Sequence, residues 1–279
     1  MVQQVTNSRT LLIGAVIVLA GCSDAGRVSE PDDYDASVVN TAAQSSENTL
    51  KDKNDVQIVS ATGDITAAVE EYRTLLGALN PNLPNEQPGG RREINWDAVP
   101  AAVTNNDLFP GNFFNVNSPR GVLFTTDGPA FRISDNGYVD VNPNYAGEFN
   151  FFSPFKLFVA RGSTITDIRF VVAGSNTPAT VTGFGSVFAD VGHAHSTTIE
   201  YFDAAGNRLL TVAAPRRSDE SGLSFVGAVF DSRIVARVRI TSGDTPIDAG
   251  IDDNVKGAGS KRDIVAMDDF IYGEPRASN

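Results

Sequence analysis

The pattern of apolar and polar positions over most of the chain is typical of strands. From residue 121 onward, short runs rich in Val, Ile, Phe and Thr are separated by Gly, Asn, Asp and Pro, as in strands joined by turns. Strands are predicted over residues 122–126, 130–134, 155–160, 165–172, 179–190, 197–203, 208–213, 223–230, 234–241 and 263–272. Helices do not alternate with these runs, so the pattern predicts an all-β fold, a two-sheet antiparallel sandwich of jelly-roll type.

One segment has the period of a helix instead. Its apolar positions are Ile65, Val69, Tyr72, Leu75 and Leu76, which fall on one face of a helix. Asp64 before the segment is a residue type that favours the start of a helix, and Gly77 after it is one that favours the end. Three prolines and a Gly-Gly pair make residues 80–90 a loop. We therefore expect residues 59–120, with one short helix and a Pro/Gly-rich loop, to pack on a β-sandwich formed by residues 121–275.

The amino terminus has the layout of a secretion signal. Arg9 is followed by an apolar run over residues 11–20 and then by Gly21 and Cys22. A membrane-spanning helix needs roughly 20 apolar residues, and this run is about half as long. The sequence LAGC at residues 19–22 resembles the bacterial lipobox. The resemblance implies a signal peptide over residues 1–21, cleavage before Cys22 and acylation of its thiol, which would anchor the protein to a membrane.

Two further expectations follow from this end of the chain. Ser23 and Asp24 place no aspartate directly after the cysteine, and similarity to lipoprotein sorting rules then favours the outer membrane. Ordinary signal cleavage beside an incidental cysteine is the alternative. Residues 22–58 are rich in Ser, Asp, Asn and Ala, and residues 23–57 contain eight acidic and three basic side chains. Such a composition predicts a disordered acidic tether.

Charge and cysteine content narrow the classes of partner. The formal net charge is −12, and removal of the signal peptide with Arg9 makes it −13, so nucleic acid is excluded as an expected partner. Cys22 is the single cysteine, so the exported domain has no disulfide and depends on its core. A glycan or another envelope component remains as the expected partner, besides the membrane itself.

Three short motifs resemble an uncharacterised family of secreted bacterial β-rich proteins. They are GRREINWDAVP at residues 90–100, FFNVNSPRG at residues 113–121 and MDDFIYGEP at residues 267–275. Many members of that family end in a PEP-CTERM-type sorting tail, which does not follow Asn279 here. The resemblance covers roughly residues 60–275 and implies a β-rich fold but no assigned activity. We expect the lipid on Cys22 to do the anchoring that the tail does in those proteins.

The most polar cluster surrounds the single tryptophan, at Arg92, Asn95, Trp96 and Asp97. In a glycan-binding site the indole would stack on the apolar face of a sugar while its neighbours bond the hydroxyl groups. In an architectural role the same residues would lock the loop onto the sandwich, with Trp96 buried and Arg92 paired to a carboxylate.

A second cluster suggests a structural calcium ion. Asp268 and Asp269 are adjacent on the last predicted strand, so they are expected to point to opposite faces. Oxygen ligands suit Ca²⁺, and Asp263, Glu148 and Asp190 are candidates to complete the site. In the alternative, these aspartates bond to backbone amides and to arginines such as Arg237 or Arg239, and no metal ion is present.

Evidence for catalysis in the sequence is weak. His193 and His195 are the only histidines, and two ligands do not make a metal site. A serine-hydrolase elbow is absent from the sequence, although paired carboxylates for glycoside cleavage are available. The expected function is therefore a surface-anchored, non-catalytic lipoprotein that binds a glycan or envelope component. A structural or adhesive envelope protein is the first alternative, and a carbohydrate-active hydrolase is the second.

Overall fold

The computed structural model describes residues 50–52, 56–217, 222–251 and 261–278. The predicted signal peptide, Cys22 and most of the predicted tether lie outside the described residues. Strand β1 (Leu50–Asp52) lies within the predicted tether and pairs with β2 (Val56–Thr62), which in turn pairs with β13 (Leu223–Phe230). The described end of the predicted tether therefore contains strands that pair with the domain. Within the part that the structure describes, none of the helices has the length and apolar character needed to cross a bilayer.

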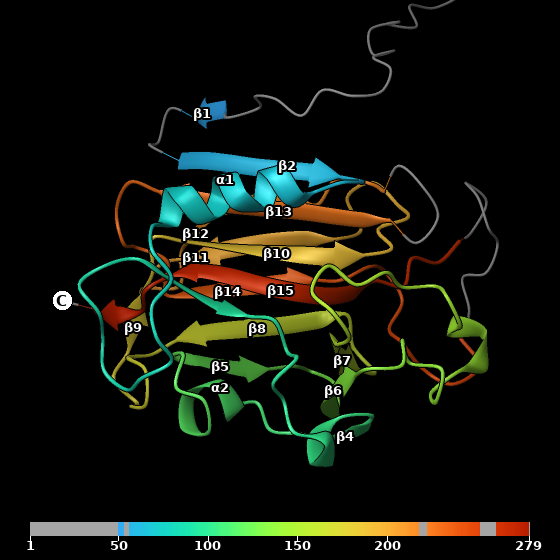
Figure 1. Ribbon diagram of the computed structural model, residues 1–279. Helices are drawn as coiled ribbons and strands as arrows, with labels where there is room; N and C mark the ends of the chain where they lie inside the picture. The colour runs from blue at the N-terminus through green and yellow to red at the C-terminus, as the bar shows by residue number, and fades with distance from the viewer. Residues whose placement is uncertain (1–49, 53–55, 218–221, 252–260, 279) are drawn as a thin grey trace, which may run out of the picture. The chain divides into compact units, whose positions relative to one another are not determined.

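Two antiparallel sheets make up the sandwich (Figure 1). Sheet A has the order β1 (Leu50–Asp52), β2 (Val56–Thr62), β13 (Leu223–Phe230), β10 (Gly183–Ala189), β15 (Ala266–Gly273), β7 (Leu157–Arg161), β6 (Ala130–Ser134) and β4 (Asn106–Phe109), with β3 (Arg91–Ile94) also paired to β15. Sheet B has the order β12 (Arg208–Ala213), β11 (Thr198–Phe202), β14 (Arg237–Thr241), β8 (Ile165–Phe170) and β5 (Val122–Thr125). Strands β9 (Ala179–Thr180) and β16 (Arg276–Ala277) form a separate pair. The predicted all-β two-sheet antiparallel sandwich is confirmed.

The jelly-roll type stays a prediction. The inner strands of the two sheets follow the orders β13-β10-β15-β7 and β12-β11-β14-β8, which are orders that such a topology requires. Each predicted strand has a counterpart in these sheets. Strands β2, β3 and β4 were not predicted, because β3 carries three charged residues and the other two lack clean alternation.

The predicted helix is α1 (Thr66–Leu76), and its apolar face covers the outer side of sheet A beside β2 and β13 (Figure 1). Tyr72 packs where Gly185 of β10 pairs with Gly227 of β13. A Cβ atom at Gly227 would lie 2.7 Å from the Tyr72 ring, so the helix can approach this closely only over glycines. Three shorter helical segments are η1 (Ala101–Val103), α2 (Phe113–Val116) and η2 (Pro143–Tyr145).

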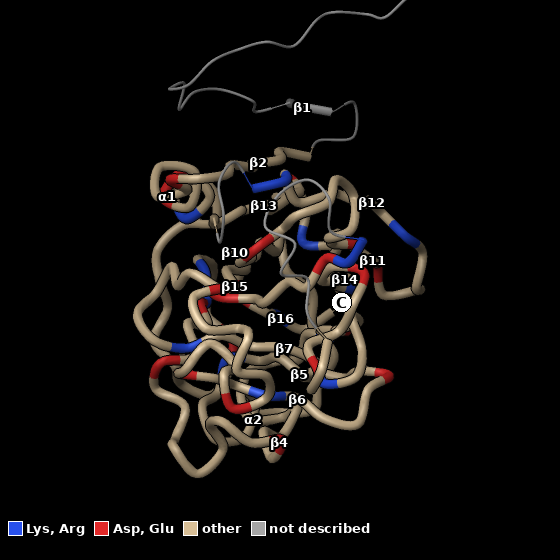
Figure 2. Tube along the Cα trace, turned by 90° about the vertical axis from the view of Figure 1, so that its right-hand side faces the viewer, with Lys and Arg blue, Asp and Glu red and all other residues tan. Residues whose placement is uncertain are grey.

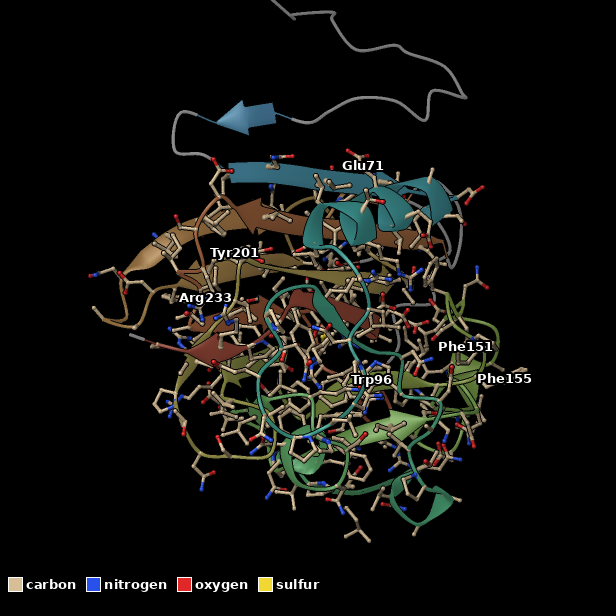
Figure 3. The ribbon with its side chains drawn as sticks, turned by 60° about the vertical axis from the view of Figure 1, so that its left-hand side comes forward. Glu71, Trp96, Phe151, Phe155, Tyr201 and Arg233 are labelled. Atoms are coloured by element: carbon tan, nitrogen blue, oxygen red, sulfur yellow. The ribbon has the colours of Figure 1, made fainter. Side chains whose placement is uncertain are left out.

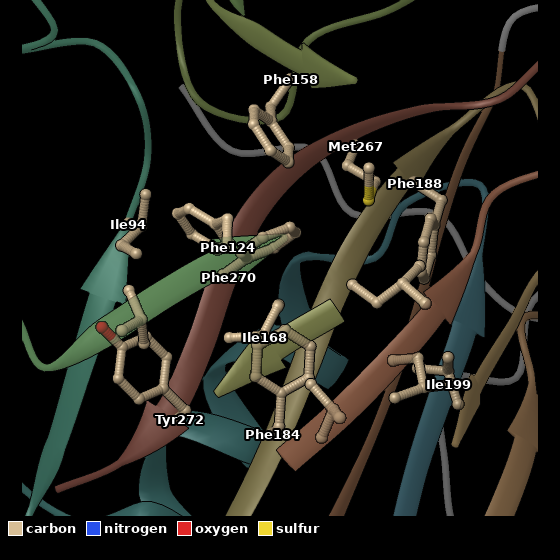
Figure 4. Packing of buried hydrophobic residues seen from close by; sticks show 14 of the residues in the cluster. Ile94, Phe124, Phe158, Ile168, Phe184, Phe188, Ile199, Met267, Phe270 and Tyr272 are labelled. Atoms are coloured by element: carbon tan, nitrogen blue, oxygen red, sulfur yellow. The ribbon is translucent and has the colours of Figure 1, made fainter. Parts of the chain in front are cut away.

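The space between the sheets is filled by aromatic and aliphatic side chains. Figure 4 shows Phe124, Phe158, Phe184 and Phe270 packed in this core, and all four are buried. Because no disulfide joins the described strands, burial of this apolar surface is the main favourable contribution to folding. Loops lie on the outer side of sheet A beside β15.

A buried ion pair holds those loops. Arg92 of β3 donates from Nε to Glu274 Oε2 at 2.6 Å and from Nη2 to Glu274 Oε1 at 2.8 Å. Its Nη1 donates to the carbonyl oxygens of Pro81 and Pro119 at 2.9 and 3.0 Å. Glu274 also accepts from Asn80 Nδ2 at 2.8 Å. The pair therefore ties the Pro-rich loop, the loop before β5 and the end of β15 together.

Removing one partner of this pair is expected to be strongly destabilising. The replacement Glu274→Gln leaves the Arg92 guanidinium buried without a counter-charge, which typically costs about 3–5 kcal/mol. Urea unfolding of the full chain, followed by the fluorescence of its single tryptophan, measures the loss. The matched control is Glu200→Gln, because the Glu200–Arg208 pair is solvent-exposed and should contribute less than about 1 kcal/mol. Equal losses in the two variants would contradict the role given to Glu274.

Candidate functional site

A cleft with two adjoining halves lies beside β15 and the loops that Arg92 holds. The polar half has a volume of about 290 Å³, and its walls include Arg73, Asn80, Asn82, Glu93 and Asp269. The apolar half has a volume of about 360 Å³, and its walls include Val99, Pro100, Phe113, Phe114 and Ser118. Asn95 and Arg120 line both halves. The two halves therefore adjoin at these two residues and differ in character.

Trp96 contributes only an edge to this cleft, since it is 1% exposed. Its ring stacks on Phe158 with the centroids 4.2 Å apart, and its Nε1 donates to the carbonyl oxygen of Asp268 at 2.7 Å. The backbone of Trp96 has a φ of 66°, a rare value for a bulky residue. Figure 3 shows the ring inside the fold, in contrast to Phe155 at its edge. The sugar-platform hypothesis is therefore wrong for Trp96, because neither ring face is open to a ligand.

The other three residues of the predicted glycan site have separate positions. Arg92 is fully buried against Glu274 and shapes the cleft without lining it. Asn95 is exposed and lies where the two halves meet. Asp97 is half-buried and lines neither half, and burial raises the pKa of its carboxyl group. Of the four, only Asn95 offers an open side chain to a ligand in the cleft.

The two adjacent aspartates of β15 lie in a β-bulge. Ser186 of β10 pairs with Phe270, and Phe188 pairs with Met267, so one residue of β10 faces both Asp268 and Asp269. A bulge allows Met267 and Phe270 to enter the core although they are three positions apart. The expectation that the two carboxyls point to opposite faces is wrong, since Asp268 bonds to Phe152 and Ser153, which line the same half of the cleft as Asp269.

The two aspartates have different partners. Asp268 accepts from the Phe152 backbone N–H at 2.7 Å and from the Ser153 hydroxyl at 3.0 Å. Asp269 has its Oδ2 3.6 Å from Arg73 Nη2, and its Oδ1 has no hydrogen-bond partner among the described residues. The Asp269 side chain is 3% exposed. It therefore presents a nearly buried acceptor to the polar half of the cleft.

Burial raises the pKa of both carboxyls of this pair. Desolvation raises the pKa of Asp269 to about 6, while Ser153, Asp268 and Arg73 oppose that rise. Desolvation and the charge of Asp269 raise the pKa of Asp268 well above its usual range. Desolvation and the charge of its neighbour therefore favour the protonated form of the pair.

Basic side chains surround Glu93 on the other wall. Arg73 of α1 donates from Nε and Nη2 to the two Glu93 carboxylate oxygens at 2.9 and 2.8 Å. Arg91 donates from Nε to Glu93 Oε1 at 2.6 Å. Arg73 and Arg91 therefore neutralise Glu93. Figure 2 shows that acidic and basic residues are interspersed with one another over the rest of the described chain as well.

The predicted calcium ligands do not meet in one place. Asp263 accepts from the Gly192 backbone N–H at 2.6 Å and from Ser196, whereas Asp190 pairs with Arg217. Glu148 is half-buried in the segment after η2. Among the described residues, no group of three or more acidic, His or Cys side chains is placed to hold a metal ion. The five predicted ligands therefore do not form one site in the described structure.

The remaining candidates also have protein partners. His193 Nδ1 lies 3.2 Å from Asp244 Oδ2, and Ser196 bonds to Asp263 instead of the imidazole, so this group lacks the hydrogen bond that a nucleophilic triad needs. Arg237 and Arg239 both pair with Asp167 on sheet B. The alternative that these aspartates bond backbone amides and arginines agrees with the structure, since Asp268 accepts from the Phe152 N–H and Asp269 lies beside Arg73. Only its two examples, Arg237 and Arg239, are wrong.

Sequence reasoning missed most of the cleft. Arg73 belongs to the polar side of a helix, Asn80 and Asn82 to a loop, and Arg120 to the SPRG motif, and these positions are far apart in the chain. The spacing of Met267 and Phe270 was an available signal for the bulge, because two core residues three apart on a strand require an extra residue between them.

Comparisons with known proteins add little to this description. No protein-family model and no curated protein matches the chain. A solved structure with some similarity is the enzymatically active domain of tailspike protein 4 from bacteriophage CBA120, with 14% identity, a TM-score of 0.18 and coverage of 49% of this chain and 20% of that chain. This chain thus spans about a fifth of the tailspike chain. A likeness of this size carries no argument about family or activity.

The raised pKa of Asp269 predicts a pH-dependent stability. Between about pH 4, the ordinary pKa of an aspartate, and pH 6 the folded state keeps a proton that the unfolded chain has released, so stability falls as pH rises. In Asp269→Asn we expect a shallower fall and, above pH 7, a gain on the order of 1–2 kcal/mol. Urea unfolding from pH 4 to pH 8 measures both.

The control for this experiment is Asp203→Asn. Hydrogen bonds from Asn207 lower the pKa of Asp203 in the β11–β12 hairpin. The ionised Asp203 carboxylate therefore stabilises the fold at pH values above the pKa that this group has in the unfolded chain, and this stabilisation is lost in acid. This variant should therefore lose stability at neutral pH. A steeper pH dependence in Asp269→Asn than in the native chain would refute the role of burial.

Proposed function

We propose that this protein is a lipid-anchored, non-catalytic binding protein of the bacterial envelope, and that its cleft binds a glycan. The observation that carries the proposal is the pairing of a polar half rich in amide groups with an apolar half that contains an accessible aromatic ring. Sugars combine hydroxyl groups with apolar C–H faces, so a site for them needs both kinds of wall.

The polar half is suited to hydroxyl groups. Asn80, Asn82 and Asn95 line it, and an amide side chain can both donate and accept a hydrogen bond. Asp269 adds an acceptor with a free oxygen atom. A buried acceptor without a partner costs about 1–3 kcal/mol, and a ligand hydroxyl that donates to it would offset that cost.

The apolar half can contact the face of a sugar ring. Phe113 is only partly buried, and together with Val99 and Pro100 it gives this half an apolar surface. Phe113 thus takes the part that sequence reasoning assigned to Trp96. Its ring packs against Phe109 with the centroids 5.3 Å apart and lines the apolar half.

A binding role is also supported by the arrangement of the carboxyl pair. Glycoside hydrolysis uses two carboxyls about 5 Å or more apart, both reaching the substrate. Asp268 is instead fully buried under Phe152 and Ser153, so it does not reach a substrate in the cleft as a second carboxyl. Acidic catalysis by this pair is therefore a weaker explanation of the cleft than recognition.

Export and anchoring rest on the sequence of residues 1–24. Together they form an apolar segment, a lipobox-like LAGC and a following serine, which support a lipid on Cys22 and sorting to the outer membrane. A lipoprotein amino terminus carries more than one acyl chain, which favours durable attachment.

Glycan binding is tested with the full chain in detergent on an array of bacterial surface oligosaccharides. Trp96 is the single tryptophan and touches the apolar half, so its fluorescence can follow each titration. We expect at least one glycan to bind, and Asn95→Ala to weaken that binding about fivefold or more, which corresponds to one hydrogen bond of about 1 kcal/mol. The matched control is Asn176→Ala, an exposed asparagine outside the cleft.

Two outcomes would overturn this proposal. Absence of binding to every glycan tested favours a structural or adhesive envelope protein. Release of reducing sugar ends from a bound glycan, abolished in Asp269→Asn, favours the carbohydrate-active hydrolase.

Lipidation makes a separate prediction. Mass spectrometry of the protein recovered from cells is expected to find an amino terminus at Cys22 with acyl groups attached. Cys22→Ala should accumulate the uncleaved, unacylated chain, because the processing peptidase needs the lipid-modified cysteine, whereas Ser23→Ala should be processed normally. An unmodified Cys22 in the native protein would contradict the proposal.

A further inference from the structure

The wall between the two halves of the cleft contains a buried charge that the protein does not neutralise. Arg120 is 9% exposed. Its Nε donates to the Glu93 carbonyl oxygen at 2.9 Å, and its Nη1 donates to the Ser118 hydroxyl. Its guanidinium carbon lies 4.9 Å from the centroid of the Phe114 ring. All of these partners are uncharged.

The other arginines of comparable burial have carboxylate partners. Arg92 is paired with Glu274, Arg73 with Glu93, and Arg132 with two aspartates. For Arg120, the described part of the chain provides no carboxylate within 4.0 Å. Burial lowers the pKa of Arg120, and the nearby Arg92 contributes in the same direction. An unpaired charge in such a position is costly, and an anion that enters the cleft would offset that cost.

We infer that the ligand is an acidic oligosaccharide, with a uronate-type carboxylate paired to Arg120 and a neighbouring hydroxyl donating to Asp269 Oδ1. This inference rests on the proposed function, because it names the class of glycan that the cleft binds. It is carried by two nearly buried groups without protein partners of the required kind, one a cation and one an acceptor, on the walls of one cavity.

The chemistry of the walls favours a carboxylate over a more highly charged anion. A carboxylate is planar and can take two parallel hydrogen bonds from a guanidinium edge. Glu93 and Asp269 line the same half as Arg120, so a phosphate dianion would meet repulsion that a single charge largely avoids. Nη2 of Arg120 has no protein acceptor in the described structure and is the atom free to bond such a group.

The position of Arg120 also orients the rest of the sugar. Since Arg120 lines both halves, a ring whose carboxylate is held there can place its hydroxyl edge toward Asn82 and Asp269. Its C–H face then lies toward Phe113. One residue at the junction thus sets the direction in which the ligand lies.

The test compares each acid with its neutral form. Oligomers of galacturonate, glucuronate and mannuronate are titrated into the full chain in detergent, and each is compared with the oligomer whose carboxyl groups have been reduced to alcohols. We expect at least one uronate to bind ten times or more tighter than its reduced form. Arg120→Gln should remove that difference, and Arg120→Lys should keep part of it.

Two controls distinguish a loss of recognition by Arg120 from a loss of folding and from a general change in charge. Arg169→Gln removes an exposed arginine of β8 and should leave the preference unchanged. Thermal unfolding of each variant shows whether it is folded, and should Arg120→Gln fail to fold, the comparison of acid with reduced oligomer on the native chain still decides.

The outcomes separate this inference from the proposed function. Equal binding of acidic and reduced oligomers overturns the inference and leaves glycan binding intact. Tighter binding of a sulfated oligomer than of every uronate overturns the assignment to a carboxylate. Binding of none of these and of no array glycan overturns both.

Discussion

The charges of Arg92 and Glu274 have been taken out of water and face each other across segments that are distant in the sequence. Taking such charges out of water is costly, and it is tolerated because every donor of the guanidinium finds an oxygen atom. The consequence is geometric. Carbonyl groups of the Pro-rich loop and of the SPRG loop can bond to Arg92 in only one arrangement, and that arrangement forms the rim of the cleft.

The bulge at Asp268 and Asp269 is a second constraint of the same kind. The core requires Met267 and Phe270 on the inner side of sheet A, and one extra residue on β15 satisfies this requirement. Both carboxyls are then on the outer side beside Arg73, where burial favours their protonated form and one oxygen remains without a partner. A feature demanded by packing thereby places a polar group where a ligand can reach it.

Arg120, a buried cation with uncharged partners, and Asp269 Oδ1, a buried oxygen without a partner, both line the polar half of the cleft. Elsewhere in the described structure buried arginines have carboxylates, as Arg132 does with Asp107 and Asp140. Arg120 departs from that rule at the junction of the polar and apolar halves. Native proteins satisfy nearly all buried polar groups, so such departures in a cavity are consistent with a binding site.

The sequence by itself determined the fold class, and the expectation of export and of a lipid on Cys22 rests on the sequence alone. The signal-like segment and Cys22 are local patterns, and the periodicity of apolar residues predicted helix α1 and the strands from β5 to β15, because these depend on neighbours in the chain. The cleft depends on contacts between distant residues, so only the tertiary structure decided it. The same letters around Trp96 suit an exposed platform or a buried anchor, and the difference arises from Phe158 and the Asp268 carbonyl, 62 and 172 positions further along. Arg120 looked like any other arginine in the sequence, since the absence of a carboxylate near it is a property of the folded chain.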